Sequence, residues 1–346
     1  MELQISKEQK ESLEKQQYRF VGHHSAVKVC GWTKNHIMNK GVCYKYAFYG
    51  IRSHQCLQMT TSMFCASRCV FCWRGEKAPV SKEWYGPVDD PSFIIDDSIK
   101  AHLSLLEGFN GNPKANKDLV SEMKTIRHVA LSLTGEPITY PKINEILKEF
   151  HKRGISTFLV SNAQYPDEIE SIENVTQLYL SIDAPNMDKF KEVDRPLFTD
   201  YEDRILRSLD VLATRPYRTC VRLTLIKDLN MSDLGGYKNL IERGNPDMIE
   251  LKAYMHVGAS KVLLEYSQMP FMDDVVDFAE KLESELSGYE IVAKHNPSRV
   301  VLLMKKSLNK KSFINFNNFF NIVNSGKQIK TEDYSELEMQ DNKMIK

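Results

Sequence analysis

The sequence predicts an α/β fold, a partial, TIM-like (β/α) barrel of about six parallel strands. From residue 57 onward, segments that read as strands alternate with segments that read as helices, and this order is typical of parallel strands with helices packed outside them. Several of the strand-like segments also alternate polar and apolar side chains. An open sheet covered by helices on both faces would be apolar throughout, so the alternation favours a barrel with a polar, functional interior.

Six strand candidates follow one another along the chain, at residues 57–64, 127–133, 155–161, 176–182, 217–226 and 247–254. Helical patterns lie between or after them, at 96–108, 141–154, 201–215, 233–244 and 272–288. The second helix begins near Pro141 and stops at Gly154, residues that favour a helix start and a helix end. Residues 290–304 contain two further edge-strand candidates, and residues 108–122 are expected to form an inserted loop.

Three of the strands show the polar alternation most clearly. Their polar positions are Tyr179, Ser181, Asp183, Arg222, Thr224, Glu250 and Lys252. Successive side chains of a strand point to opposite faces. We therefore expect the apolar positions to pack against helices and the polar positions to line the barrel.

The chain divides into three parts. Residues 1–56 are expected to form an N-terminal helix, over roughly residues 1–17, and a cysteine-rich segment that is irregular over 20–56 and packs on the barrel. Residues 57–305 form the barrel. Residues 306–346 are expected to form a C-terminal helix that closes the barrel, because four apolar residues fall on one helical stripe, and a loose polar tail beyond Ser325. Lysines precede the helix, so the alternative is a basic, aromatic surface that contacts RNA.

The charged residues balance, with 46 Lys and Arg against 46 Asp and Glu, so the formal net charge is zero. A nucleic-acid partner would therefore need a local basic patch. The charged N-terminal segment lacks the apolar core of a signal peptide. No stretch approaches the roughly 18 uninterrupted apolar residues of a membrane span. We expect a cytoplasmic protein with no membrane partner.

Six of the seven cysteines lie between Cys30 and Cys72. In a reducing cytosol, this crowding indicates metal or redox chemistry rather than disulfides. Cys220 stands apart in a strand-like run. It is expected to be a small buried residue.

Cys65, Cys69 and Cys72 form the strongest motif, in MFCASRCVFCWRGE. Their spacing can wrap three thiolates around three corners of a [4Fe–4S] cluster and leave the fourth iron open to a small molecule. A structural zinc site would need a fourth ligand, and no close Cys or His pair follows. The motif, with an aromatic residue before its last cysteine, resembles the radical S-adenosylmethionine (SAM) signature. This resemblance implies a cluster that binds SAM.

Further candidates follow the strands, at the end where barrel enzymes place their active sites. Gly135 and Glu136, in SLTGEP, resemble the glycine-rich motif that meets the SAM amino group. Glu136 would accept from the ammonium, and Gly135 would let the backbone approach the ligand. Asn162 follows the third strand, and Ser181 and Asp183 end the fourth, where they could hold the SAM ribose or carboxylate. An ordinary turn or cap residue is the alternative at each position.

Cys30, Cys43 and Cys56 form a second trio, with twelve residues between each pair. One interpretation is a second cluster, and the other is a zinc site that borrows His36 or His54.

Lys45 lies two residues after Cys43, in GVCYKYAFYG. Its neighbours Tyr44, Tyr46 and Phe48 could desolvate the ammonium, as carbonyl-trapping lysines require. An ordinary lysine is the alternative.

From about residue 22 to about residue 305, the chain resembles the tRNA 4-demethylwyosine synthase family. The motifs are GHHSAVKVCGWTKN, CYKY, RSHQC, MFCASRCVFCWR, SLTGEP, LYLSIDAP and IELKAYMHVGAS. The resemblance implies a second, auxiliary [4Fe–4S] cluster on Cys30, Cys43 and Cys56. It implies a lyase of wyosine biosynthesis that condenses pyruvate with N1-methylguanosine, 3′ of the anticodon in tRNA-Phe, to the tricyclic 4-demethylwyosine. For Lys45 it implies a Schiff base with pyruvate, and the alternative is that pyruvate chelates the open iron of the second cluster.

In the implied reaction, a 5′-deoxyadenosyl radical removes hydrogen from the N1-methyl group. The methylene radical then attacks the carbonyl carbon of pyruvate, whose carboxylate carbon is lost. The sequence shows no flavodoxin-like domain of the eukaryotic kind, so it resembles the archaeal form. We therefore expect an external electron donor, ferredoxin or flavodoxin, and a monomer.

The target base is expected to flip out of the anticodon loop. Arg52, Arg74 and Lys77 are candidate phosphate contacts, with solvated surface charge as the alternative.

Two rival functions are a radical SAM activase or maturase with an auxiliary cluster, and a non-catalytic iron–sulfur protein that binds RNA. The polar interior and the open iron argue against the second.

Overall fold

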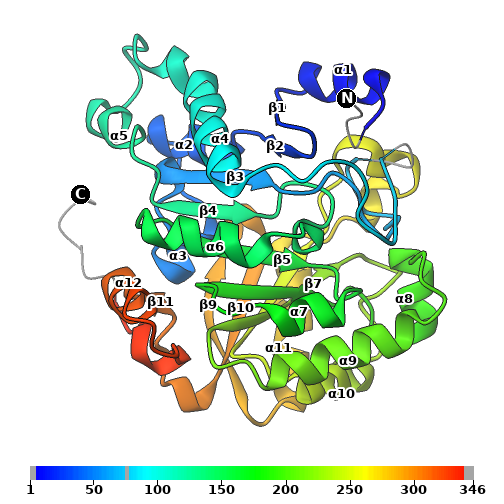
Figure 1. Cartoon of the computed structure of the whole chain (residues 1–346). Helices are drawn as coiled ribbons and strands as arrows, with labels where there is room; N and C mark the ends of the chain where they lie inside the picture. The colour runs from blue at the N-terminus through cyan, green and yellow to red at the C-terminus, as the bar shows by residue number, and fades with distance from the viewer. Residues whose placement is uncertain (1–4, 75–77, 339–346) are drawn as a thin grey trace.

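Six neighbouring parallel strands form the centre of the molecule, a computed structural model that describes residues 5–74 and 78–338. The strands are β3 (Cys56–Thr60), β4 (His128–Leu131), β5 (Ser156–Ser161), β6 (Gln177–Ser181), β7 (Thr219–Leu225) and β8 (Met248–Ala253). They lie in sequence order and match the six predicted strands. The partial (β/α) barrel is confirmed (Figure 1).

Helices connect the parallel strands and pack outside them (Figure 1). They are α4 (Pro91–Leu106), α5 (Lys117–Glu122), α6 (Ile143–Lys152), α7 (Pro166–Ser171), α8 (Met187–Asp194), α9 (Tyr201–Ala213), α10 (Leu234–Gly244) and α11 (Met272–Glu285). In α6 the buried side chains include Ile143, Ile146, Leu147 and Phe150, which share one helical face. The predicted inserted loop contains α5. Among residues 5–74 and 78–338, no helix is long and apolar enough to cross a membrane.

The polar side chains predicted to face inward lie in register on β6, β7 and β8. Ser181 pairs with Arg222, and Arg222 with Glu250, while Thr224 pairs with Lys252 in the next row. The alternate positions, Leu178, Leu180, Leu223, Leu225, Ile249 and Leu251, are fully buried. The predicted alternation is therefore confirmed, and it places charged side chains inside the barrel.

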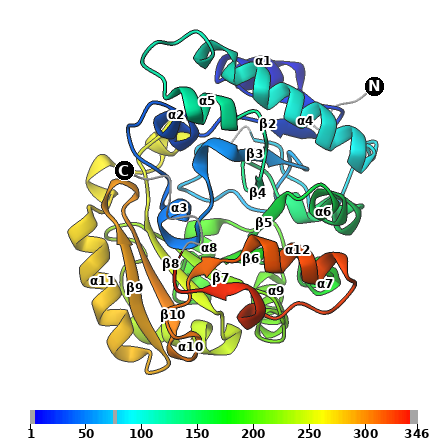
Figure 2. The ribbon, with the colours of Figure 1, turned by 90° about the vertical axis from the view of Figure 1, so that its left-hand side faces the viewer.

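The prediction of irregular structure over residues 20–56 is wrong. After helix α1 (Lys7–Lys15), the chain forms the hairpin of β1 (Arg19–Val21) and β2 (Ser25–Val27), then α2 (Gly31–Ile37) and α3 (Tyr44–Tyr49). Strand β2 pairs antiparallel with β3 and so extends the sheet. Elements of three to seven residues are too short for a polar–apolar period to show. Figure 2 shows α3 in the opening between β3 and β9, and α3 contacts β9 and β11.

The other edge of the sheet contains the two strands predicted for residues 290–304, and both pair antiparallel. It consists of β10 (Val300–Lys305), which pairs with β8, and β9 (Tyr289–His295). Helix α12 (Phe316–Asn324) and the short pair β11 (Phe313–Ile314) and β12 (Ser335–Glu336) follow. Figure 1 places α12 on the side away from the loops that follow the strands.

Up to residue 338, the prediction of a loose tail is wrong. Ile329 and Tyr334 are fully buried. Tyr334 Oη donates to the Thr176 carbonyl at 3.0 Å and accepts from the Arg218 amide at 2.9 Å. The buried Arg218 guanidinium also bonds to Ser335, so the tail is fixed to the barrel by polar residues. The three domain boundaries stay a prediction.

Candidate functional site

The ends of the parallel strands surround a cavity of about 440 Å³. It is lined by all eight residues predicted for the first trio and the strand ends: Cys65, Cys69, Cys72, Gly135, Glu136, Asn162, Ser181 and Asp183. Asp194, Arg222 and Lys252 also line it and were not among the candidate ligands. The structure therefore brings residues from seven separate segments to one place, at the end of the barrel where (β/α) enzymes carry their active sites.

The loop that carries Cys65, Cys69 and Cys72, the cluster loop, is held by residues 193–197, a segment that the sequence analysis did not identify. The Val70 amide donates to the Val193 carbonyl, and the Leu197 amide to the Ala66 carbonyl, each at 2.8 Å. Between them, Asp194 accepts a hydrogen bond from Cys69, and burial raises its pKa well above the usual range. Its second oxygen has no partner among the described residues. No local motif marks Asp194, because its partner lies 125 positions earlier in the chain.

The first trio fits an iron–sulfur cluster. Burial raises the pKa of Cys65 to about 11 and that of Cys69 further, and the neighbouring cysteines add to both. The Cys65 and Cys69 thiols would stay protonated at neutral pH without a metal, and binding to cluster irons as thiolates would offset this cost of burial. Asn162 Nδ2 donates to Cys65 Sγ at 3.3 Å, and Arg74 Nε donates to Cys72 Sγ at 3.4 Å. Donors of this kind stabilise cluster sulfurs.

A cluster differs from a single metal ion in its geometry. No three His, Cys, Asp or Glu side chains of residues 5–74 and 78–338 gather closely enough to hold one ion. In a [4Fe–4S] cluster, each thiolate bonds a different iron.

Arg74 does not have the orientation predicted for a phosphate contact. Its Nη1 donates to the Met63 carbonyl at 3.1 Å while Nε faces Cys72. Burial opposes its charge, but the Cys72 and Cys65 sulfurs outweigh this and raise the pKa of Arg74. The guanidinium therefore belongs to the surroundings of the first trio.

Replacing Arg74 with Gln should lower the midpoint potential of the reconstituted first cluster. Reduction adds negative charge, and a cation that donates to a cluster sulfur stabilises that charge. We expect the oxidised/reduced equilibrium to shift by about tenfold, or about 59 mV for one electron. A redox titration followed by electron paramagnetic resonance measures it. Arg127→Gln, at an exposed arginine, is the control, and equal potentials in the two variants would contradict the role.

Glu136 and Gly135 are fixed by the chain that enters the cluster loop. The Glu136 amide donates to the Phe64 carbonyl at 2.7 Å. Gly135 has a φ of +65°, and a Cβ there would lie 2.0 Å from the Ser62 carbonyl oxygen. Glycine is therefore required by contact with residues 62–64, and not only by the approach of a ligand as predicted. Glu136 Oε2 accepts from the Asn162 amide at 3.1 Å, while Oε1 has no partner among the described residues.

Replacing Glu136 with Gln should stabilise the reconstituted, SAM-free protein at high pH. Burial raises the pKa of Glu136 from 4.5 to about 8. The folded state thus binds more protons than the unfolded state between these values, and wild-type stability falls as pH rises through that window. We expect the gain to be near zero at pH 4.5 and on the order of 2 kcal/mol above pH 8.

Melting temperatures from pH 5 to 9 measure this gain, with Glu145→Gln on α6 as the control. A gain that does not grow with pH would contradict a buried, ionisable Glu136.

Ser181 and Asp183 already have protein partners. Ser181 Oγ accepts from Arg222 Nη2 at 3.1 Å, and Asp183 Oδ1 accepts from the Thr224 amide at 2.6 Å. Burial raises the pKa of Asp183 to about 6, although Arg222 opposes this. Both side chains line the cavity, so contact with SAM stays a prediction.

The second trio also comes together. Cys30 and Cys43 are the N-cap residues of α2 and α3, and Cys56 begins β3. Burial raises the pKa of Cys43 to about 11 and that of Cys56 to about 12; Cys30 contributes to the first, and Cys43 and Cys30 contribute to the second. This donor set fits a second cluster for the same reason as the first.

The histidines of the zinc alternative have other partners. His54 Nδ1 lies 3.2 Å from His36 Nδ1, and His54 Nε2 lies 2.8 Å from Glu122 Oε2. Both nitrogens of His54 are therefore engaged, and His36 contacts His54 through Nδ1.

Lys45 is buried, with 9% of its surface exposed, beside the second trio. Its Nζ lies 4.5 Å from the centre of the Tyr179 ring and 5.6 Å from that of Phe158. Two of the predicted neighbours, Tyr44 and Tyr46, do not share the face of Lys45, because residues one apart on a helix do not face each other. Tyr44, for example, donates to Glu250 at 2.9 Å. Rings from β5 and β6 desolvate the ammonium instead.

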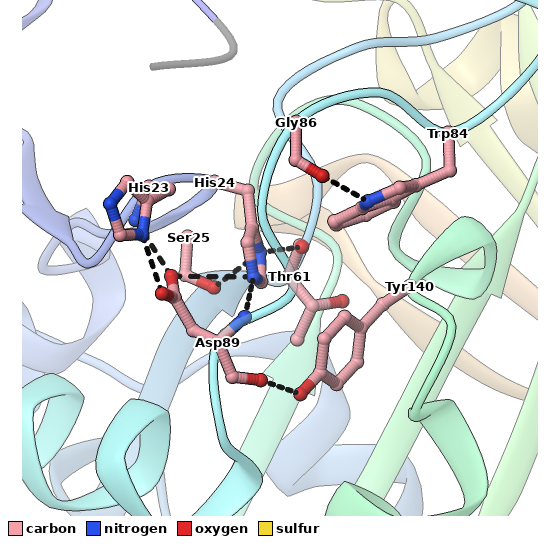
Figure 3. A network of polar contacts seen from close by, with 8 residues as sticks. All are labelled: His23, His24, Ser25, Thr61, Trp84, Gly86, Asp89 and Tyr140. Atoms are coloured by element: carbon pink, nitrogen blue, oxygen red, sulfur yellow. Dashed lines mark hydrogen bonds and ion pairs between the residues drawn. The ribbon is translucent and has the colours of Figure 1, made fainter. Parts of the chain in front are cut away.

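A hydrogen-bonded joint connects the N-terminal segment to the strand that enters the cluster loop (Figure 3). His24 Nε2 accepts from the Asp89 amide at 3.1 Å, so Nδ1 carries the proton and donates to the Thr61 carbonyl at 2.7 Å. Burial lowers the pKa of His24, which favours this neutral form. His23 Nδ1 lies 2.6 Å from Asp89 Oδ1. Thr61 directly follows β3, so the joint fixes the segment of the second trio against the loop of the first.

The predicted phosphate contact Arg52 does not line this cavity. Arg52 lies at the opposite end of the barrel, beside a cavity of about 370 Å³ that Arg127 and Phe316 also line. Lys77 lies outside the described residues.

Two family models match the chain, namely "Radical SAM superfamily" over residues 59–241 and "Wyosine base formation" over residues 243–305. The S-adenosyl-L-methionine-dependent tRNA 4-demethylwyosine synthase of Oryza sativa subsp. japonica is 44% identical over 333 residues. This alignment covers 94% of the chain and 51% of the rice protein, so the chain spans about half the length of that relative.

Two solved structures are similar over almost their whole length. A structure of TYW1 with a lysine–pyruvate adduct bound is 35% identical, with a TM-score of 0.80, and the match covers 88% of this chain and 97% of that one. A crystal structure of archaeal TYW1 is 33% identical, with a TM-score of 0.72 and the same coverage. The chain belongs to the radical SAM superfamily and, within it, to the tRNA 4-demethylwyosine synthase (TYW1) family.

Proposed function

We propose that the chain condenses pyruvate with N1-methylguanosine, 3′ of the anticodon in tRNA-Phe, to form 4-demethylwyosine. The observation that carries this proposal is the position of Lys252, which lines the cavity of the first trio and also interacts with Lys45 and with Cys43 of the second trio. The name of the rice relative and the lysine–pyruvate adduct of the related structure support it. The activase and non-catalytic alternatives account neither for the name of the rice relative nor for the lysine–pyruvate adduct of the related structure.

Cys65, Cys69 and Cys72 would hold the SAM-binding cluster, and Cys30, Cys43 and Cys56 the auxiliary one. When bound, the first cluster and SAM supply a 5′-deoxyadenosyl radical able to remove hydrogen from a methyl group. Glu136 would accept from the SAM ammonium, since its free oxygen is buried at the cavity. Gly135 shapes the adjacent backbone, Asn162 orients Cys65, and Ser181 and Asp183 would meet the ribose or carboxylate.

Lys45 would bind pyruvate covalently. Its amine attacks the carbonyl carbon, a C–N bond forms, and the carbonyl oxygen leaves as water to give an imine. The rings of Tyr179 and Phe158 lie over the amine and keep bulk water from it, which favours the dehydrated product. Chelation of pyruvate by the open iron of the auxiliary cluster is the second candidate.

The remaining partners follow from this chemistry. The methylated base must leave the anticodon stack to enter the barrel, so we propose that it flips out. An external donor, ferredoxin or flavodoxin, would supply the electron. A cytoplasmic, monomeric protein of archaeal type remains our prediction.

The test is an anaerobic reaction of reconstituted protein with SAM, dithionite, pyruvate and tRNA-Phe that carries N1-methylguanosine. The digested nucleosides are weighed by mass spectrometry. We expect a pyruvate-dependent 4-demethylwyosine nucleoside. 5′-Deoxyadenosine without a modified base would overturn the substrate assignment, and the absence of both from iron-loaded protein would overturn the enzyme assignment.

A further inference from the structure

Two cations inside the barrel lack an acidic partner. Arg222 Nη2 donates to Ser181 Oγ at 3.1 Å, and Lys252 Nζ lies 5.4 Å from the centre of the Tyr44 ring. Within residues 5–74 and 78–338, no carboxylate oxygen comes within 4.0 Å of either charged group. The two side chains come from adjacent strands, β7 and β8, and both line the cavity of the first trio.

The nearest acid in register is already engaged elsewhere. Glu250 pairs with Arg222 along the sheet. Its two oxygens accept from Tyr44 Oη at 2.9 Å and from Tyr49 Oη at 2.7 Å, both on α3. The carboxylate is thus turned toward α3.

The other charged and titratable groups around this pair are Lys45, Cys43, Asp183 and Cys220. Asp183 is bonded to the Thr224 amide, and its pKa is raised by burial. Lys45 adds a third cation on the side of the second trio. Arg222 and Lys45 therefore both disfavour the charge of Lys252, whereas Glu250 and Asp183 favour the charge of Arg222.

Two neighbouring buried cations are costly without an anion. Burial lowers the pKa of Lys252, and Arg222 lowers it further, although Cys43 and Glu250 oppose this. A carboxylate bound between Lys252 and Arg222 would offset both the burial and the mutual repulsion. Guanidinium and ammonium groups are the usual donors to such a ligand.

We propose that Lys252 and Arg222 bind the carboxylate of a small-molecule substrate, and we assign it to the oxo acid that reacts with Lys45. This assignment rests on the proposed function. Lys252 interacts with Lys45 and Cys43 and also lines the cavity, so a carboxylate held there would lie near the lysine that reacts with the carbonyl carbon. The methionine carboxylate of SAM is the second source of the same chemistry.

The experiment traps the oxo acid on anaerobic, reconstituted protein. Sodium cyanoborohydride reduces the imine to a stable amine, and mass spectrometry of peptides locates and counts it at a series of pyruvate concentrations. Lys252→Gln should raise the half-saturating pyruvate concentration about tenfold or more, because charge-assisted hydrogen bonds are the stronger kind. Lys252→Arg, which keeps the charge, should stay within about threefold of wild type.

The neutral ester methyl pyruvate separates binding from folding. It has the same carbonyl but no carboxylate, so Lys252→Gln should trap it as well as wild type does. Lys152→Gln, an exposed lysine on α6, is the matched control. Equal losses with pyruvate and its ester, or no loss with either pyruvate or SAM, would overturn the carboxylate site.

A parallel measurement identifies the source of the carboxylate. Half-saturating SAM is measured from 5′-deoxyadenosine formation without pyruvate. A rise in Lys252→Gln for SAM alone supports the carboxylate site but gives it to SAM. If wild type cleaves SAM yet traps no pyruvate, the proposed oxo-acid substrate fails, and the SAM measurement alone decides whether Lys252 binds a carboxylate.

Discussion

Replacing Cys65 with alanine is expected to abolish 5′-deoxyadenosine formation, whereas replacing Cys43 should preserve it and abolish the tricyclic base. The two cysteines belong to different trios, and only Cys65 lines the cavity of Glu136 and Asn162. Loss of one thiolate leaves a second iron of that cluster without a protein ligand. The cluster built on the other trio keeps all three of its ligands.

Both products are measured in one reaction, by chromatography of 5′-deoxyadenosine and by mass spectrometry of the digested tRNA. Iron content and EPR spectra show which cluster each variant has lost. Cys220→Ala is the matched control, because Cys220 is a fully buried cysteine outside both trios, and it should keep both products. A Cys43→Ala protein that still makes the tricyclic base would contradict the auxiliary-cluster assignment.

The hydrogen bonds of His24, Asp89 and Thr61 provide a route by which loss of one cluster affects the other. They tie the segment of the second trio to the residue that follows β3, so loss of the auxiliary cluster could disturb the first. If Cys43→Ala loses SAM cleavage while retaining the EPR signal of the first cluster, the two trios are coupled through this joint. Substituting His24 in an otherwise intact protein should then reproduce the loss.

The six parallel strands could be predicted because each carries its own periodic signal. The polar faces of β6, β7 and β8 alternate within single segments, and that pattern is a property of local sequence. The same is true of the spacing of Cys65, Cys69 and Cys72. These features determine where the cavity lies and which thiolates surround it.

What could not be predicted depends on contacts between distant segments. Asp194 reaches Cys69 only because the chain after α8 pairs with the cluster loop. The orientation of the Arg74 side chain could not be predicted either, because it depends on a hydrogen bond to the Met63 carbonyl. Lys45 likewise has its partners on β5 and β6, far along the chain, and its immediate aromatic neighbours face elsewhere.

Lys252 is an intermediate case. Sequence alternation correctly placed it among the inward polar residues, together with Arg222 and Glu250. Its lack of an acidic partner within the described residues became visible only when Glu250 proved to bond to Tyr44 and Tyr49. A charge pattern along one strand shows which side chains are inside, but not how their charges are balanced.

Replacing Lys45 with arginine is expected to remove the pyruvate adduct and the tricyclic base completely while leaving SAM cleavage intact. Arginine keeps a cation beside Cys43 and Cys56, whose pKa values Lys45 lowers. A guanidinium stays protonated near neutral pH and does not condense with a ketone. The substitution therefore separates the charge of Lys45 from its nucleophilicity.

The measurement combines cyanoborohydride trapping, peptide mapping and nucleoside analysis on the same reconstituted samples. Lys34→Arg is the matched control, because Lys34 is exposed on the neighbouring helix α2, and it should behave as wild type. Iron content must be unchanged in both variants for the comparison to hold.

The outcome distinguishes the two ways in which pyruvate could be bound. If Lys45→Arg makes no adduct and no tricyclic base but still cleaves SAM, the imine is required for carbon–carbon bond formation. If the variant makes the base at an undiminished rate, pyruvate must be activated without a lysine, and the open iron of the auxiliary cluster becomes the remaining electrophilic partner.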